Sequence, residues 1–323
     1  MIIVTGGAGF IGSAFVWKLN SEGIDDILIV DELGETEKWK NLVNRRYTDY
    51  IHKDVFLRMI RSPQDSMKIR AIIHMGACSS TTERNAEYLM DNNYHYTCRL
   101  AEWALSKQVR FIYASSAATY GDGSQGFSDE DAVTETLRPI NMYGYSKQLF
   151  DLWVLRQQAE TQCAGIKFFN VFGPNEYHKG DMTSVIFKAF SQIKEAGKVR
   201  LFKSYKPEYG DGEQKRDFVY IKDCVDVLWW LLEHPEANGI FNLGTARSRT
   251  WNDLIRAVFS AMNMEPRIEY FDMPIEIRDQ YQYFTEAKMD KLRSAGCPAA
   301  FRPLEEAVRD YVANHLQKPD PCL

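Results

Sequence analysis

The chain has 323 residues, of which 45% are hydrophobic and 26% are charged, and its formal net charge is −5. The length allows two domains, or one large domain with an attached lobe, and the composition is that of a globular protein. The negative charge argues against nucleic acid as a partner, because nucleic-acid binders usually carry a basic excess. There is no run of about 18 apolar residues, so no membrane-spanning helix is expected.

The spacing of the cysteines and the first residues of the chain indicate the cellular compartment of the protein. Six cysteines are scattered without a C-x-x-C pair, which fits neither a zinc site nor a disulfide framework. We therefore expect free thiols and no metal. The opening residues, MIIVTGG, form a strand pattern without the charged start and cleavage site of a signal peptide. These features predict a cytoplasmic protein.

The first half of the chain alternates short apolar runs with longer amphipathic stretches. In chain order, the pattern predicts a strand at 2–4, a helix at 10–22, strands at 26–30 and 71–75, a helix at 85–107, a strand at 109–114, a helix at 143–159 and a strand at 165–171. Strand and helix in repeated order predict a Rossmann-type doubly wound α/β fold, in which helices cover both faces of a parallel sheet.

The regular alternation of strand and helix patterns ends after residue 172, where Gly173 and Pro174 interrupt it. Beyond them we expect a helix at 182–196, an exposed loop at 203–214, apolar segments at 218–221, 223–232 and 240–243, and a last helix at 302–316. No linker separates these segments, so we expect a smaller α/β substrate lobe interleaved with the first domain. The expected dinucleotide-binding domain takes 1–170 with a return segment at about 214–237, and the lobe takes about 171–213 and 238–323.

A glycine-rich turn stands between the first expected strand and the first expected helix. Gly6, Gly9 and Gly12 allow a tight turn and a close approach of the backbone to a pyrophosphate, which the helix N-terminus also attracts. Asp31 follows after the next strand, about 20 positions on, where an acid can bind a ribose. The alternative is a turn that needs glycine only for sterics. Strand, spacing and acid together favour a nicotinamide dinucleotide, and the spacing resembles that of extended short-chain dehydrogenases/reductases.

The residues around Asp31 leave NAD and NADP open. Asp31 suits the free ribose hydroxyl of NAD, and Glu32 would repel a 2′-phosphate. Lys38 and Lys53 favour NADP if they fold over the adenosine end, and are otherwise solvated surface lysines.

A tyrosine–lysine pair opens the helix expected at 143–159. Tyr143 and Lys147 are four residues apart, so they project from one helix face. A nearby ammonium favours the phenolate of Tyr143, which makes the phenol an acid/base near neutral pH, and Lys147 can also hold the nicotinamide ribose. Ser115 or Ser116, at the end of the strand expected at 109–114, reaches the same sheet edge, and Ser116 is favoured by motif position. The pair alone is weak evidence, but the glycine turn strengthens it.

The residues after Ser116 reduce the number of reactions that the site could catalyse. Sugar-nucleotide dehydratases of this superfamily place an Asp–Glu pair there to eliminate water. This chain has Ala117 and Ala118, and methyl groups cannot transfer protons. An epimerase or a simple reductase remains.

Several stretches together resemble the ADP-L-glycero-D-manno-heptose 6-epimerase family, over residues 1 to about 311. The most specific are residues 76–83 (GACSSTTE), 90–94 (MDNNY), 113–121 (YASSAATYG), 169–180 (FNVFGPNEYHKG), 215–220 (KRDFVY) and 241–245 (FNLGT). The resemblance implies a tightly held NADP, with NAD as the alternative, that is reduced and reoxidised within one turnover. It implies inversion of C-6″ of ADP-D-glycero-D-manno-heptose through a ketone, for the heptose of the lipopolysaccharide core, and a homo-oligomer, with a pentamer as the suggested assembly.

The resemblance also assigns residues. It implies two proton-transferring residues, Tyr143 and Lys179. Besides Gly6, Gly9 and Gly12 of the turn, the cofactor positions are Phe10, Ile11, Asp31, Glu32, Lys38, Lys53, Met75, Gly76, Ala77, Cys78, Ser79, Asn92, Lys147 and His178. Besides Ser116, the substrate positions are Asn170, Asp181, Lys188, Phe202, Arg216 and Tyr281, of which Arg216 suits a diphosphate because its guanidinium can bind two oxygens.

Three positions depart from the family pattern. Glu32 stands where Asn is expected, Asp181 where Ser is expected, and Lys188 where His is expected. Two further hypotheses stay open: a 4-epimerase or ketoreductase acting on another nucleotide sugar, and a nucleotide-sensing protein without catalysis.

Overall fold

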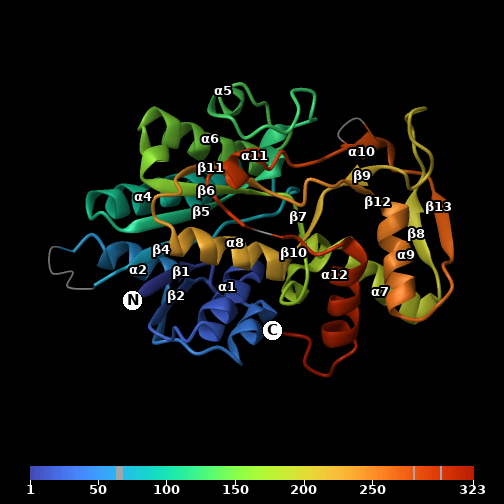
Figure 1. Ribbon diagram of the computed structural model, residues 1–323, viewed down its shortest axis with the longest axis horizontal. Coiled ribbons are helices and arrows are strands. Elements are labelled where there is room, and N and C mark those ends of the chain that lie inside the picture. Colours follow the sequence, from blue (N-terminus) through green and yellow to red (C-terminus); the bar gives the residue numbers. More distant parts are fainter. Residues whose placement is uncertain (63–67, 279–280, 299) are drawn as a thin grey trace.

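The computed structural model describes residues 1–62, 68–278, 281–298 and 300–323 (Figure 1). A seven-stranded sheet, in which every neighbouring pair is parallel, forms the larger part of the molecule. In spatial order its strands are β11 (Gly239–Leu243), β6 (Cys163–Phe168), β5 (Arg110–Ser116), β4 (Ala71–His74), β1 (Ile2–Thr5), β2 (Ile27–Asp31) and β3 (Asp49–His52). This confirms the predicted doubly wound parallel sheet, in which the strand order reverses between β1 and β4.

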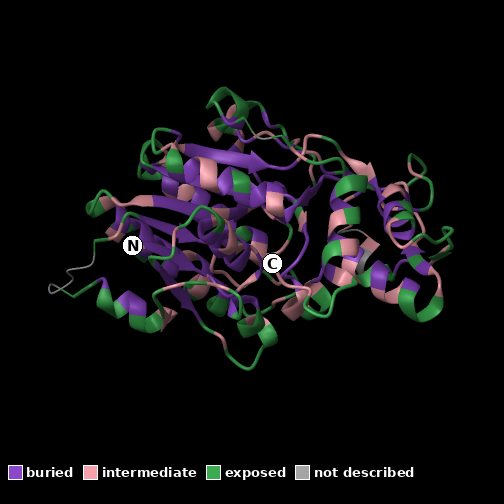
Figure 2. Cartoon of the chain, turned by 60° about the horizontal axis from the view of Figure 1, so that its bottom comes forward, coloured by how far each residue is buried: buried purple, intermediate pink, exposed green. Residues whose placement is uncertain are grey.

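Side chains of each strand point alternately into two cores, one on each face of the sheet. Ile2 and Val4 of β1 belong to one core, whereas Ile3 belongs to the other. Helices α1 (Phe10–Ser21) and α8 (Ile221–Glu233) cover the first face. The second face is covered by α2 (Lys53–Met59), α4 (Tyr96–Ser106) and α6 (Met142–Arg156). Figure 2 shows the strands as the most buried part of the chain.

The helix expected at 85–107 is divided in the structure. A short α3 (Ala86–Leu89) and α4 are joined by a π-helical segment, Met90–His95. This wider turn contains Asn93, which is buried and exchanges hydrogen bonds of 2.9 Å with the backbone of Cys78. Asn93 also donates to the Ser146 hydroxyl at 3.0 Å. The π segment therefore ties the loop after β4 to α6, at the edge where a ligand would bind.

Other helices and strands of the structure differ more from the prediction. The strand expected at 165–171 is two strands, because β7 (Asn170–Phe172) leaves the sheet and pairs with β10 (Phe218–Tyr220). The elements β3 and α2 were not predicted. The loop at 203–214 is exposed over 205–208 but buried at Gly212 and Gln214.

The smaller lobe lies to the right in Figure 1. It contains α7 (Val185–Ala196), α9 (Trp251–Ala261), α12 (Leu304–Tyr311) and two strand pairs, β8 (Val199–Phe202) with β13 (Ile268–Phe271) and β9 (Lys215–Arg216) with β12 (Arg249–Thr250). The described part of the chain also contains the shorter helices α5 (Asp131–Thr134), α10 (Ile275–Arg278) and α11 (Asp290–Ser294). The expected lobe boundary at 238 is wrong for β11, which pairs with β6 in the main sheet. Within the described ranges, no helix has the length and apolar character to cross a membrane.

A fully buried ion pair joins α6 to the sheet. The Asp151 carboxylate of α6 lies 2.6 Å from the Lys167 ammonium of β6, and neither side chain is exposed. The same carboxylate accepts hydrogen bonds from Ser115 at 2.7 Å and Tyr113 at 3.0 Å, both on β5. Such a pair is stable inside a protein only when its charges are paired and hydrogen-bonded, as they are here.

We predict that Asp151→Asn lowers the free energy of unfolding by about 3–5 kcal/mol, because it leaves the Lys167 ammonium buried without a counter-charge. Urea unfolding measures the loss. The double variant Asp151→Leu/Lys167→Met recovers much of it, since both charges are then removed. Asp226→Asn is the matched control, because the half-exposed Asp226 pairs with Lys18 at the surface and costs less than about 1 kcal/mol. An equal loss in both single variants contradicts the prediction.

Candidate active site

The glycine-rich turn lies between β1 and α1, against the loop after β4. Gly6 has φ +65°, and a Cβ atom there would lie 2.6 Å from the backbone of Gly76. A Cβ on Gly12 would collide with the Gly6 carbonyl oxygen. Both positions therefore require glycine, and the turn brings its backbone, with the first N–H groups of α1, to the carboxyl edge of the sheet.

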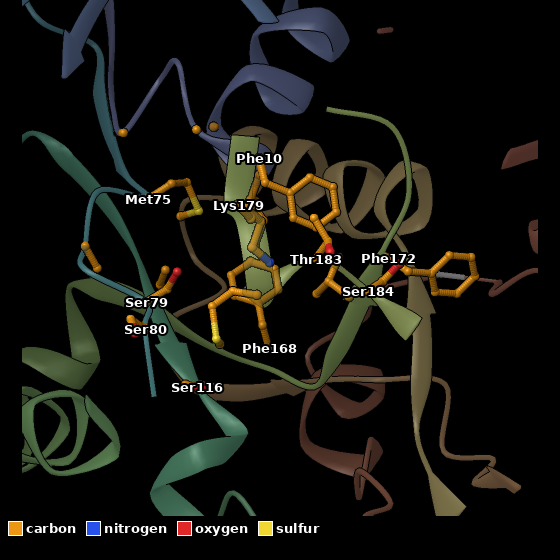
Figure 3. Close-up of a pocket in the computed structure, with 18 of the residues that line it drawn as sticks. Phe10, Met75, Ser79, Ser80, Ser116, Phe168, Phe172, Lys179, Thr183 and Ser184 are labelled. Atoms are coloured by element: carbon orange, nitrogen blue, oxygen red, sulfur yellow. The ribbon is translucent and has the colours of Figure 1, made fainter. Parts of the chain in front are cut away.

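A cavity of about 750 Å³ opens at this edge, at the point where the strand order reverses. The predicted site residues that line it are Gly6, Gly9, Phe10, Ile11, Gly12, Asp31, Lys38, Met75, Gly76, Ala77, Cys78, Ser79, Ser116, Tyr143, Lys147, Asn170, His178 and Lys179. The larger domain and the segment before α7 thus meet around one space, part of which Figure 3 shows.

One end of the cavity carries the acids and lysines from which the sequence could not decide between NAD and NADP. The buried Asp31 carboxylate accepts hydrogen bonds from the backbone of Ala8 at 2.8 Å and of Glu32 at 2.7 Å, and from the Lys38 ammonium at 2.7 Å. Beside the cavity, Lys53 lies 2.7 Å from the Glu32 carboxylate and donates to Asn92 at 2.7 Å. The hydrogen bond from Lys53 is the main cause of the lowered pKa of Glu32. Each lysine is therefore paired with an acid.

Tyr143 and Lys147 both line the cavity from the first turns of α6. Burial raises the pKa of the Tyr143 phenol, and a hydrogen bond with Ser116 opposes that rise. Burial lowers the pKa of Lys147 to about 8, and its amine donates to the Ala114 carbonyl at 2.7 Å. Lys147 is not among the groups that shift the pKa of Tyr143, so the phenolate expected beside an ammonium stays a prediction.

Ser115 and Ser116 have different surroundings. The Ser115 hydroxyl donates to the buried Asp151 carboxylate, whereas Ser116 hydrogen-bonds Tyr143. Ser116 is therefore the hydroxyl that can act beside the phenol.

Lys179 enters the cavity from the segment before α7. Its ammonium lies 5.1 Å from the centre of the Phe10 ring, and Figure 3 shows its side chain extending among the labelled pocket residues. Burial lowers the pKa of Lys179, the buried Glu176 carboxylate opposes this, and Lys188 lowers it further. Glu176 is itself held by hydrogen bonds from Ser184 at 2.6 Å and Tyr311 at 2.9 Å. The amine is thus shifted toward its neutral, proton-accepting form.

The remaining predicted substrate residues lie beside the cavity. Lys188 donates to the backbone carbonyl of Asp181 at 2.6 Å, on the exposed side of Lys179. In the lobe, the Arg216 guanidinium lies 5.3 Å from the Tyr281 ring and 5.7 Å from the Trp251 ring. The Phe202 ring packs against Tyr281, with ring centres 6.4 Å apart.

Trp251 was missed by the sequence analysis, although it lines the cavity and donates from Nε1 to the Tyr281 hydroxyl at 2.9 Å. It connects Arg216 to the cavity. A lone tryptophan at the start of a helix carries no local signal that could have identified it.

A dinucleotide fits these residues. A Cβ at Gly6 or Gly12 would displace the backbone of the turn, and α1 has Gly9 at its N-cap, which has no side chain to bind the first N–H groups. Those groups and the dipole of the twelve-residue helix attract a pyrophosphate.

The profile of the NAD dependent epimerase/dehydratase family matches residues 2–244. The chain belongs to this family. The chain therefore has an epimerase/dehydratase fold, belongs to a family that uses a nicotinamide cofactor, and is an epimerase, an isomerase.

Similar proteins within the epimerase/dehydratase family have a more specific named activity. It is 60% identical, over the whole of both chains, to ADP-L-glycero-D-manno-heptose-6-epimerase of Nitratidesulfovibrio vulgaris. It is 49% identical, again over all of both chains, to the enzyme of that name in Fusobacterium nucleatum. The solved ADP-L-glycero-D-manno-heptose-6-epimerase of Helicobacter pylori is 26% identical with a TM-score of 0.81, covering 97% of this chain and 95% of that one.

The pKa of Lys147 leads to a pH prediction for the cofactor-free chain. Its value of about 8 lies below 10.5, the ordinary value, so between these pH values the unfolded chain binds more protons and stability rises with pH. The wild type should therefore gain a few kcal/mol relative to Lys147→Met from about pH 7 to about pH 10. Urea unfolding of both proteins across this range measures the gain, and a constant difference would show that Lys147 titrates as an ordinary lysine.

Proposed function

We propose that the chain is an ADP-L-glycero-D-manno-heptose 6-epimerase that uses bound NADP. The observation that carries this is the meeting of two proton-transferring groups, Tyr143 and Lys179, in one cavity beside the glycine turn. A simple reductase needs one such group, whereas two groups can serve the two configurations of the hydroxyl. Ala117 and Ala118 follow Ser116 and cannot transfer the protons that dehydration requires.

The pKa values of the two groups shift in opposite directions, and these directions suit the reaction. A nicotinamide dinucleotide held by Gly6, Gly9 and Lys147 would supply a hydride acceptor and donor for C-6″ of the heptose. Lys179, whose pKa is lowered, takes the proton of the hydroxyl as the hydride leaves. Tyr143, whose pKa is raised, donates its proton to the keto oxygen as the hydride returns, with Ser116 as hydrogen-bond partner. Both groups then exchange protons with water, and the reverse reaction exchanges their roles.

The substrate assignment rests on relatives and on the lobe. The relatives that are 60% and 49% identical act, by name, on ADP-heptose. Arg216 is buried between the rings of Trp251 and Tyr281, and its guanidinium suits the diphosphate of such a substrate. Asn170, at the cavity, and Phe202, beside Tyr281, complete this side, with Asp181 and Lys188 at the exposed rim.

We further propose the setting of this activity. The chain forms a homo-oligomer in the cytoplasm and supplies heptose for lipopolysaccharide. We also propose that residues 1–170, a return segment at about 214–237 and β11 form the dinucleotide-binding domain and that the remainder forms the substrate lobe, with Arg216 of the return segment contacting the lobe residues Trp251 and Tyr281.

Incubating the purified protein with ADP-D-glycero-D-manno-heptose, without added cofactor, should invert C-6″, as followed by NMR. Tyr143→Phe and Lys179→Met should each lower kcat by about 10²–10⁴-fold, because each removes one proton transfer. Tyr145→Phe on the exposed side of the same helix, and Lys194→Met on the exposed side of α7, are matched controls that retain activity. An unchanged C-6″ configuration contradicts the proposal. Turnover of other nucleotide sugars indicates a 4-epimerase, and net consumption of NADPH indicates a reductase.

The preference for NADP has its own test. Lys38 and Lys53 lie at the adenosine end, and the Asp31 carboxylate already accepts three hydrogen bonds from the protein, so it has little capacity left for a ribose hydroxyl. Denaturation should release NADP. Lys38→Met and Lys53→Met should each weaken NADP binding by roughly tenfold or more and leave NAD binding nearly unchanged, because each removes a charged donor to the 2′-phosphate. Release of NAD, or equal weakening for both nucleotides, contradicts this choice.

A further inference from the structure

His74 is a buried histidine beside the glycine turn. It is the last residue of β4 and is 1% exposed. In the parallel pairing of β4 with β1 it lies opposite Thr5, the residue that precedes Gly6 of the turn. Its ring stacks with those of Tyr96 and Phe111, each with its centre 6.0 Å away. Packing therefore holds the plane of the imidazole ring.

Two threonine hydroxyls contact the two ring nitrogens of His74. Thr5 Oγ1 lies 2.6 Å from Nδ1, and Thr97 Oγ1, on α4, lies 2.8 Å from Nε2. Turning the ring over would place carbon atoms at these positions, and both distances are too short for a carbon and an oxygen. The contacts therefore fix which ring atom faces which threonine.

The hydroxyl hydrogen of Thr97 decides which nitrogen carries the proton. Thr97 Oγ1 also lies 2.6 Å from the backbone carbonyl oxygen of Asn93, one turn earlier. A carbonyl only accepts, so the single hydroxyl hydrogen is used there, and Nε2 of His74 must donate to Thr97. Nδ1 then accepts from the Thr5 hydroxyl. The opposite tautomer would need the Thr97 hydrogen at Nε2, and would leave two oxygen atoms 2.6 Å apart without a hydrogen between them.

The hydrogen bonds continue beyond Asn93 into the wall of the cavity. The two amide hydrogens of Asn93 go to the Cys78 carbonyl at 2.9 Å and to the Ser146 hydroxyl at 3.0 Å. The Ser146 hydroxyl in turn donates to the Tyr143 carbonyl at 2.7 Å. Through the backbone and side chain of Asn93, one series of hydrogen bonds thus runs from the residue before the glycine turn to the first turn of α6.

We propose that His74, in its Nε2–H form, is a positioning residue that holds the glycine turn in register with the loop 75–79 and with α6. These three segments line the cavity, whereas His74 is not among the described residues that line it, so it acts through Thr5 and Thr97. The inference rests on the proposed function only for the dinucleotide in this cavity, and not for the sugar nucleotide that is turned over.

The surroundings of His74 keep its ring uncharged. Burial lowers the pKa of His74 to about 3, and the positive charge of Lys147 contributes to the decrease. An imidazolium would place a second positive charge in the same interior as Lys147. At neutral pH the ring therefore carries one proton, and the contact with Thr97 assigns that proton to Nε2.

The form of His74 can be measured in the holoenzyme by ¹⁵N-histidine NMR. The chain has six histidines, and the His74 signal is the one that Thr97→Val shifts. At neutral pH the wild type should show a proton on Nε2 that exchanges slowly with water, and an unprotonated Nδ1. A proton on Nδ1 of His74 in the wild type overturns the proposal.

The variant Thr97→Val also tests whether these hydrogen bonds position the turn. Valine keeps the shape of threonine, but it leaves the Nε2 hydrogen of His74 without an acceptor. The bound dinucleotide should leave the holoenzyme roughly fivefold faster or more, because a buried donor without a partner is costly and the turn is no longer held in one arrangement.

Two controls separate positioning from a loss of stability. Thr134→Val makes the same change at a buried threonine whose hydroxyl has no hydrogen-bond partner among the described residues, so release should be unchanged. Val258→Ala removes buried methyl groups from α9 in the smaller lobe, and should lower the free energy of unfolding without speeding release. Release from Thr97→Val no faster than from the wild type, or an equal increase in Val258→Ala, overturns the proposal. Neither readout uses a sugar nucleotide, so a failure here is distinct from a failure of the epimerase test.

Discussion

The position of α6 depends on the Asp151 carboxylate, which has no contact with water and accepts from three groups on β5 and β6. Because Tyr143, Lys147 and Asp151 are spaced four residues apart, anchoring Asp151 to the sheet points the other two along the same stripe. Lys147 reaches the carbonyl at Ala114, next to the serine that binds Asp151. The buried charge and the reactive pair are therefore parts of one packed unit.

The second half of the site is supported by different means. Lys179 belongs to a segment that contacts α1, the 3₁₀ segment Glu37–Leu42 and the C-terminal residues, through Asn175 and Asn41. Its amine is shifted toward the neutral form by burial rather than by a strong neighbouring charge. Tyr143 is shifted toward its protonated form, also by burial. The two pKa values thus shift for the same physical reason, since burial disfavours whichever form of each group is charged.

Local patterns in the sequence were enough to predict the sheet and the first half of the site. The glycine turn, Asp31 and the Tyr143–Lys147 pair each depend on spacing along one strand or helix, and the structure brings them together at one edge. Lys179 came only from the family resemblance, because a lysine in a loop has no periodicity that distinguishes it from a solvated one.

Features that depend on contacts between distant segments could not be predicted. An apolar run such as 240–243 shows that a strand is buried, but not that it pairs with β6 rather than with strands of the lobe. Trp251 and Asn41 carry no local signal, since Trp251 lies 30 residues from its partner Tyr281, and Asn41 lies 33 and 134 residues from the carbonyls of Ala8 and Asn175. The expected phenolate at Tyr143 stays a prediction, because the desolvation that raises the pKa of this phenol depends on the packing around the helix, which the local sequence does not show.

We propose that C-6″ of the substrate loses and regains the same hydride between Tyr143 and Lys179. The most direct measurement uses substrate carrying deuterium at C-6″, turned over with excess unlabelled NADPH in ordinary water. Product with inverted C-6″ should retain its deuterium almost completely, because the hydride stays on the bound nicotinamide. Replacement of the deuterium by hydrogen from water or from free NADPH would contradict the claim.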